Sequence, residues 1–185
     1  MLFFLFLLVI SFFFPVLLFP LFIFAILFLL FIPIKFTVDS FFNIFSIPGQ
    51  IYRIATNPKL RKNHGLEHAT VNVLEGKYGY SNLAGYSREN GFYIIGAENI
   101  YDVQQAAQEG LNLIKNGRNK LAIHEHCGTS RIVANFISSI IFLLLLLYTG
   151  HFSLINVIIA IVLSHISGPF FGRIVQKKFT TSSDV

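Results

Sequence analysis

The sequence is poor in charged residues and rich in apolar ones. Of its 185 residues, 12% are charged and 54% are hydrophobic, and the mean hydropathy is +0.66. Soluble globular domains carry charge on about a quarter of their residues. The composition therefore excludes an ordinary soluble domain and predicts an integral membrane protein.

The sequence has one cysteine and no tryptophan. The single cysteine, Cys127, excludes an intrachain disulfide and fits a reducing compartment. Without tryptophan, any aromatic belt must come from tyrosine and from the 22 phenylalanines. We expect the formal net charge of +5 to orient the chain in a bilayer. The expected partners are the lipid bilayer and other membrane proteins, with no nucleic acid.

Residues 1–35 contain the long apolar run "LFFLFLLVISFFFPVLLFPLFIFAILFLLFIPI" at 2–34. No basic residue precedes the run, and it is too long for a signal peptide, so it predicts a membrane segment. A straight helix of this length measures about 50 Å, against a hydrocarbon core of about 30 Å. A tilted, proline-kinked span and a re-entrant hairpin both fit.

Residues 36–62 alternate aromatic and polar side chains and end in a basic cluster. The pattern predicts an interfacial amphipathic linker that is broken by "PG" at 48–49. Its lysines and arginines can hold the segment against anionic headgroups.

Residues 63–130 have the polarity of a small α/β unit. In chain order, the patterns predict a helix over 64–75 ended by Gly76, two strands around the turn "RENG" within 83–96, a helix over about 100–116 capped by Asn99, and a third strand "KLAIH" at 120–124.

Residues 131–172 contain two apolar stretches joined by a short loop, which predicts a transmembrane helical hairpin, and residues 173–185 form a basic tail. The lysines and arginines of the linker, of the end of the α/β unit and of the tail all lie on the same side of the hairpin. By the positive-inside rule, the α/β unit and the tail are cytoplasmic and the chain is a multi-pass protein of the inner (plasma) membrane. The predicted fold class is an α-helical integral membrane protein, with the small cytoplasmic α/β unit between the N-terminal segment and the hairpin.

The motif "HGLEH" places two histidines and a glutamate on one predicted helix. His64 and His68 are four residues apart, so their imidazoles point to the same side and can reach one Zn²⁺. With Glu67 the spacing is H-x-x-E-H, the order of an inverted zinc-peptidase motif, in which the glutamate is the general base. The alternative is a helix whose polar residues only face headgroups or hydrogen-bond within the unit.

A second polar cluster, "HEHCGTSR" at 124–131, can complete a metal site. His124 and Cys127 have ligand spacing, and histidine with cysteine suits Zn²⁺. A cysteine-nucleophile interpretation also exists, in which His124 or His126 activates Cys127 and the amides of "GTS" form an oxyanion hole. This interpretation leaves His64, Glu67 and His68 of the "HGLEH" motif without a role.

Several segments together resemble a family of small bacterial and cyanobacterial integral membrane proteins that is catalogued as a domain of unknown function. The family's two motifs are H-x-L-E-H-A-T, matched here from His64, and H-x-x-C-G-T, matched here from His124. The other matching segments are "IPGQ" at 47–50, "GFYIIG" at 91–96 and "TTSSD" at 180–184. The resemblance implies that the two motifs belong together, and it implies no activity.

Two functions therefore compete. The first is a membrane-anchored zinc hydrolase, with His64, His68, Cys127 and His124 as candidate ligands and Glu67 as the catalytic base. The second is a non-catalytic assembly or interaction protein with a structural metal or none. Three ligands with an open position favour catalysis, whereas four favour structure.

Overall fold

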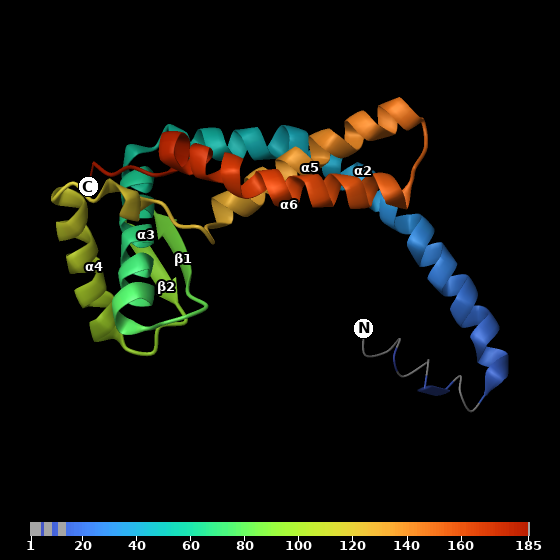
Figure 1. The fold of residues 1–185 in the computed structure, drawn as a ribbon, viewed down its shortest axis with the longest axis horizontal. Helices are drawn as coiled ribbons and strands as arrows, with labels where there is room; N and C mark the ends of the chain where they lie inside the picture. Colours follow the sequence, from blue (N-terminus) through green and yellow to red (C-terminus); the bar gives the residue numbers. More distant parts are fainter. Residues whose placement is uncertain (1–4, 6–8, 11–13, 185) are drawn as a thin grey trace.

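The computed structural model describes residues 5, 9, 10 and 14–184 and is mostly helical (Figure 1). The long helices are α2 (Leu18–Ala55), α3 (Pro58–Tyr78), α4 (Ile100–Lys115), α5 (Gly128–Thr149) and α6 (Leu154–Val175). Strands β1 (Ala84–Arg88) and β2 (Gly91–Ile95) form a two-stranded sheet. The short elements are η1 (Pro15–Leu17), η2 (Asn119–Ala122) and the π-helical turn η3 (Gln176–Thr180).

Among the described residues, three helices are long and apolar enough to cross a membrane: α2, α5, and α6 with its extension to Thr180. The 22 residues of α5 and of α6 each give a length of about 33 Å, which matches a hydrocarbon core of about 30 Å. In Figure 1 α5 and α6 run side by side with the C-terminal part of α2, whose N-terminal part extends away from them; the α3–sheet–α4 unit lies at one end of this bundle and the α5–α6 loop at the other.

The predicted helical hairpin is present as α5 and α6. Gly150, at φ 68°, ends α5, and the Ser153 side chain caps α6 by accepting a hydrogen bond from the Ile155 amide. Near the α/β unit the two helices touch through small residues. A Cβ on Gly168 would lie 2.6 Å from the Ala134 Cβ, and small residues of this kind let helix backbones approach closely.

The predicted break at "PG" 48–49 is wrong, because α2 continues through Pro33 and Pro48 as one helix. A proline removes one backbone donor, and packing of the same stretch on α5 compensates. Phe36 lies edge-to-face on Phe142 with ring centroids 4.9 Å apart, and the Asn43 amide donates to Ser139 Oγ at 3.2 Å.

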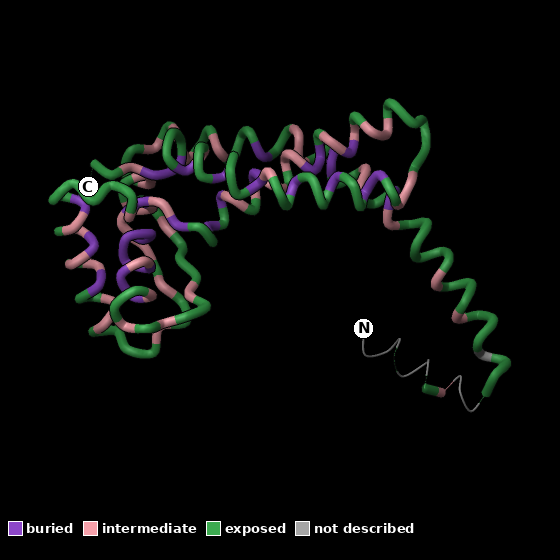
Figure 2. Tube along the Cα trace, in the orientation of Figure 1, coloured by how far each residue is buried: buried purple, intermediate pink, exposed green. Residues whose placement is uncertain are grey.

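The continuous helix also excludes the turn of a re-entrant hairpin within residues 18–34. The part of that prediction that concerns residues 1–4, 6–8 and 11–13 lies outside the described residues. Figure 2 shows that the N-terminal half of α2 is largely exposed, whereas buried residues concentrate in α3 and along the α5–α6 contact.

The α/β unit is built around α3. This helix begins earlier than predicted, where Asn57 accepts a hydrogen bond from the Leu60 amide, and it passes Gly76 to end at Gly79. The β-hairpin has the predicted position, and α4 has its predicted cap, Asn99. Their apolar core centres on Val73, Leu74 and Ala106.

The predicted third strand at 120–124 is wrong, because this segment is the 3₁₀ turn η2 followed by one extended residue, Ile123. Its carbonyls are bound by side chains of α3 and not by a neighbouring strand. The Asn72 amide donates to the carbonyls of Leu121 and Ile123, and the His68 ring binds the carbonyl of Ala122.

The segment after α6, predicted as a basic tail, is docked onto α3. Arg61 donates from Nη2 to the Thr181 carbonyl, and the Ser182 amide donates to the Arg61 carbonyl. The approach is so close that a Cβ on Gly65 would lie 2.0 Å from the Ser182 carbonyl oxygen. The end of the chain therefore covers the start of the "HGLEH" motif.

Candidate metal centre

His64 and His68 lie one turn apart on α3, with ring centroids 4.4 Å apart. Each ring uses its Nδ1 on a backbone carbonyl: His64 on Thr180 and His68 on Ala122, both at 2.9 Å. A carbonyl oxygen only accepts, so each Nδ1 carries the proton, and in the neutral ring each Nε2 is unprotonated and able to accept. Hydrogen bonds of this kind orient metal-binding histidines in known sites.

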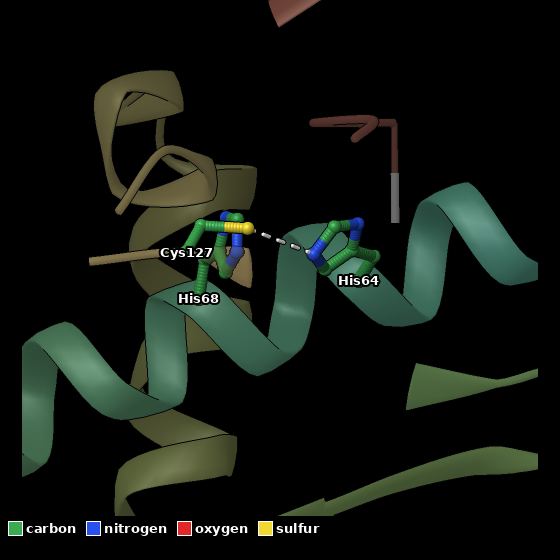
Figure 3. Close-up of side chains that lie close together, drawn as sticks. All are labelled: His64, His68 and Cys127. Carbon is green, nitrogen blue, oxygen red and sulfur yellow. Dashed lines mark hydrogen bonds between the residues drawn. The ribbon is translucent and has the colours of Figure 1, made fainter. Parts of the chain in front are cut away.

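Cys127 supplies the third group of the centre (Figure 3). Its Sγ lies 3.4 Å from the Nε2 of His64, although 63 residues separate them in the chain. The thiol also accepts a hydrogen bond from the Thr129 amide at 3.3 Å, so Cys127 is the N-cap of α5. One ligand atom from each of His64, His68 and Cys127 lies within 4.8 Å of the others. The predicted convergence of the two motifs is therefore confirmed.

The donor set fits a borderline-soft cation such as Zn²⁺. The Nε2 of His68 is buried and has no hydrogen-bond partner among the described residues, a cost that a bound cation would remove. Burial lowers the pKa of His64, and burial together with the neighbouring His64 lowers the pKa of His68 to about 3. Both imidazoles are therefore neutral at pH 7, as ligation requires.

Burial raises the pKa of the Cys127 thiol, and hydrogen bonds from Thr129 partly oppose this effect. A buried thiol without a nearby cation therefore stays protonated, which disfavours the cysteine-nucleophile interpretation. The histidine that forms a hydrogen bond with the Cys127 thiol is His64. Among the described residues, neither His124 nor His126 forms a hydrogen bond with this thiol.

Glu67 is buried on the side of α3 that faces β1. Its Oε2 accepts a hydrogen bond from Ser87 Oγ at 2.6 Å, and its Oε1 lies where a Cβ on Gly85 would come within 1.8 Å. Burial raises the pKa of Glu67 to about 7, against the opposing effect of the Ser87 hydroxyl. The carboxylate adds to the rise of the Cys127 pKa, but it stands outside the group of three ligand atoms.

His124 is buried beside the centre and outside the group of three. Its Nε2 lies 3.1 Å from Glu75 Oε2, and its ring centroid lies 6.0 Å from that of His68. Its backbone amide donates to Gln176 Oε1. The intervening residues Glu125 and His126 are exposed, and Glu125 pairs with Arg173.

Sequence reasoning missed the groups that hold the ligands in place. The carbonyls of Ala122 and Thr180 orient the two imidazoles, and Ser87 holds Glu67. Backbone carbonyls leave no signal in a sequence. The segment "TTSSD", which begins at Thr180, contributes to the family resemblance but contains no side chain that points to this role.

Comparison with known proteins gives a family and a relative but no activity. Residues 59–185 match the family described as "Domain of unknown function (DUF6391)". A protein of Picosynechococcus sp. described as "Uncharacterized protein" is 34% identical over 80 aligned positions, which cover 38% of this chain and 39% of the relative. The matched part of the chain thus spans about two fifths of the relative's length. No solved structure matches the chain.

Proposed function

This chain belongs to the DUF6391 family, and we propose that it is a membrane-anchored metalloprotein, most concretely a zinc-dependent hydrolase. The observation that carries the proposal is the convergence of His64, His68 and Cys127, with both imidazoles held by their Nδ1 atoms so that the unprotonated Nε2 atoms can bind a metal. Three protein ligands leave one position open, which is the pattern of catalytic zinc sites.

The membrane part of the proposal depends on α2, α5 and α6, whose length and apolar surface suit a bilayer. The basic residues at the end of α2 and the start of α3, around η2 and after α6 lie at the end of the bundle that carries the α/β unit. By the positive-inside rule this end faces the cytoplasm, in the inner (plasma) membrane of a bacterial cell.

Each residue of the centre has a role in the proposed reaction. His64, His68 and Cys127 would hold the ion, which supplies Lewis acidity to a substrate carbonyl and to water. Glu67 accepts the proton of the attacking water and passes it to the leaving group. Ser87 keeps the Glu67 carboxylate in a fixed orientation, and His124, bound to Glu75, packs beside the centre.

Metal analysis of the full-length protein tests the first step. Protein purified in a neutral detergent should contain about one zinc per chain, and His68→Ala and Cys127→Ser should each lose most of it. His151→Ala is the matched control, because His151 is exposed in the α5–α6 loop. Equal metal content in the wild type, His68→Ala and the control would refute the metal site.

A non-catalytic role is favoured by one observation, the tight attachment of Glu67 to β1 through Ser87 and the close approach of Gly85. Such a contact also suits a residue that only ties the sheet to α3. In that case the ion is structural and the chain is an assembly or interaction protein of the membrane.

Glu67→Gln separates the two functions. If Glu67 is the general base, the variant should keep its zinc and lose activity in a complementation assay by a factor of about 10² or more. If Glu67 orients a ligand, zinc affinity should fall by about 10–100-fold. Full zinc content with full complementation would end the hydrolase proposal and leave the structural one.

A further inference from the structure

A second site lies beside the metal centre, in a cleft of about 550 Å³ between the start of α3, η2 and the docked C-terminal segment. Three cations line it: Arg61, Lys120 and Lys177. No carboxylate is among its lining residues, and none of these cations forms an ion pair with another residue of the described chain. The nearby Asp184 pairs with Lys62 at 3.4 Å. Among the described residues, the positive charge of the cleft is therefore uncompensated.

The rest of the polar lining is neutral: Asn119, Ser182 and Ser183 carry donors, and the Thr181 hydroxyl already donates to the Gln176 carbonyl. The Nη2 of Arg61 donates to the carbonyls of Lys178 and Thr181. The Nε of Arg61 is buried without a partner among the described residues. Several cations beside hydroxyl and amide donors suit an anion with several oxygens, because each oxygen can accept a charge-assisted hydrogen bond. Phosphate has this chemistry.

We propose that this cleft binds the phosphate group of an anionic ligand. Lys177 lies in η3, two residues past the end of α6, and Lys120 lies in η2, shortly before α5 begins. If these helices span the bilayer, both lysines lie at headgroup level, where basic clusters bind anionic lipids. A lipid headgroup and a soluble phosphate ester present the same group to the cleft, so the experiment has an arm for each source.

The cleft adjoins the metal centre but contains none of the metal-binding residues. Ala122, whose carbonyl binds His68, lines the cleft, as does Thr181, the neighbour of Thr180. The metal ligands His64, His68 and Cys127 are not among the lining residues. Loss of the phosphate site should therefore leave zinc content unchanged, and failure of one proposal is distinguishable from failure of the other.

The test uses the double variant Lys120→Gln/Lys177→Gln of the full-length protein, because both side chains are exposed and their loss leaves the packing intact. The matched control is Lys59→Gln/Lys115→Gln, which removes the same charge at exposed positions outside the cleft. In the first arm, inorganic phosphate is titrated by calorimetry into detergent-purified protein at low salt. In the second arm, nanodiscs of phosphatidylglycerol or phosphatidylcholine are compared by native mass spectrometry for the lipid that remains bound.

The expected result is phosphate binding that the double variant weakens by about tenfold or more and that the control retains, since each lost charge-assisted hydrogen bond costs about that factor. Retention of phosphatidylglycerol by the wild type and the control, with loss in the double variant, also supports the site and identifies the lipid as its source. If the double variant and the control behave alike in both arms, the proposal is overturned.

Discussion

Replacing Gly65 with alanine should weaken metal binding without touching a ligand. The new Cβ would lie 2.0 Å from the Ser182 carbonyl oxygen, whereas ordinary contact begins at 3.4 Å. The docked C-terminal segment must therefore retreat by about 1.4 Å, the difference between these two distances. Thr180, two residues before Ser182, is the residue whose carbonyl binds the Nδ1 of His64 at 2.9 Å. A retreat of that size breaks this hydrogen bond, because hydrogen bonds of this type end near 3.2 Å.

The size of the effect follows from the role of that hydrogen bond. His64 would keep its place on α3 but lose the partner that fixes its ring orientation and its tautomer. Loss of such a partner lowers metal affinity by about 10–100-fold in known sites. This corresponds to about 1.4–2.7 kcal/mol of binding free energy.

Competition with a chromogenic zinc chelator, on full-length protein in detergent, measures the change in affinity. Gly76→Ala is the matched control, because Gly76 lies on the same helix and a Cβ added there would meet no atom within 4 Å. Alanine there should bind zinc as the wild type does and stabilise α3 by up to about 1 kcal/mol. Circular dichroism shows whether both variants keep their helices. Zinc affinity of Gly65→Ala equal to that of Gly76→Ala would refute the reasoning.

Three further predictions concern the fold and its orientation. In a cysteine-free background, a probe at His151 should label from outside the cell and one at Arg118 should be protected; the opposite pattern would reverse the proposed topology. Asn72→Ala removes two hydrogen bonds to the η2 segment and leaves partly buried carbonyls unpaired, so thermal unfolding should show a loss of about 1–3 kcal/mol. Gly168→Ala overpacks the α5–α6 contact and should cost about 1–3 kcal/mol, whereas Gly49→Ala, with open space around it, should cost less; equal melting temperatures would contradict the packing argument.

Local signals predicted much of the fold. The cap Asn99 and the apolar spacing after it predicted α4, and the turn "RENG" predicted the β-hairpin, because caps and tight turns depend on neighbours a few residues away. The long apolar stretches predicted three helices of membrane-spanning length. Errors appeared where distant groups compete with the local preference, as at Pro48 inside α2.

The candidate site, like the fold, has one part that local sequence predicted and one part that the tertiary structure decided. The spacing of His64 and His68 on a helix places two imidazoles on one side of it, so the sequence by itself determined that pair, together with the chemical types available at 124–127. Only the tertiary structure decided which of those residues joins the pair. Cys127 does so because it caps α5, whereas His124 turns to Glu75.

What the sequence alone determined about this protein is its helical character, its apolar segments and the two motifs, since each depends on the order of residues within a few turns. The tertiary structure decided that η2 is bound by α3 side chains, that the C-terminal segment lies over Gly65, and that two carbonyls orient the histidines. These contacts join residues 49 to 117 positions apart. Their energies depend on how α3 packs against the end of the α5–α6 hairpin, and a local pattern of side chains does not predict that packing.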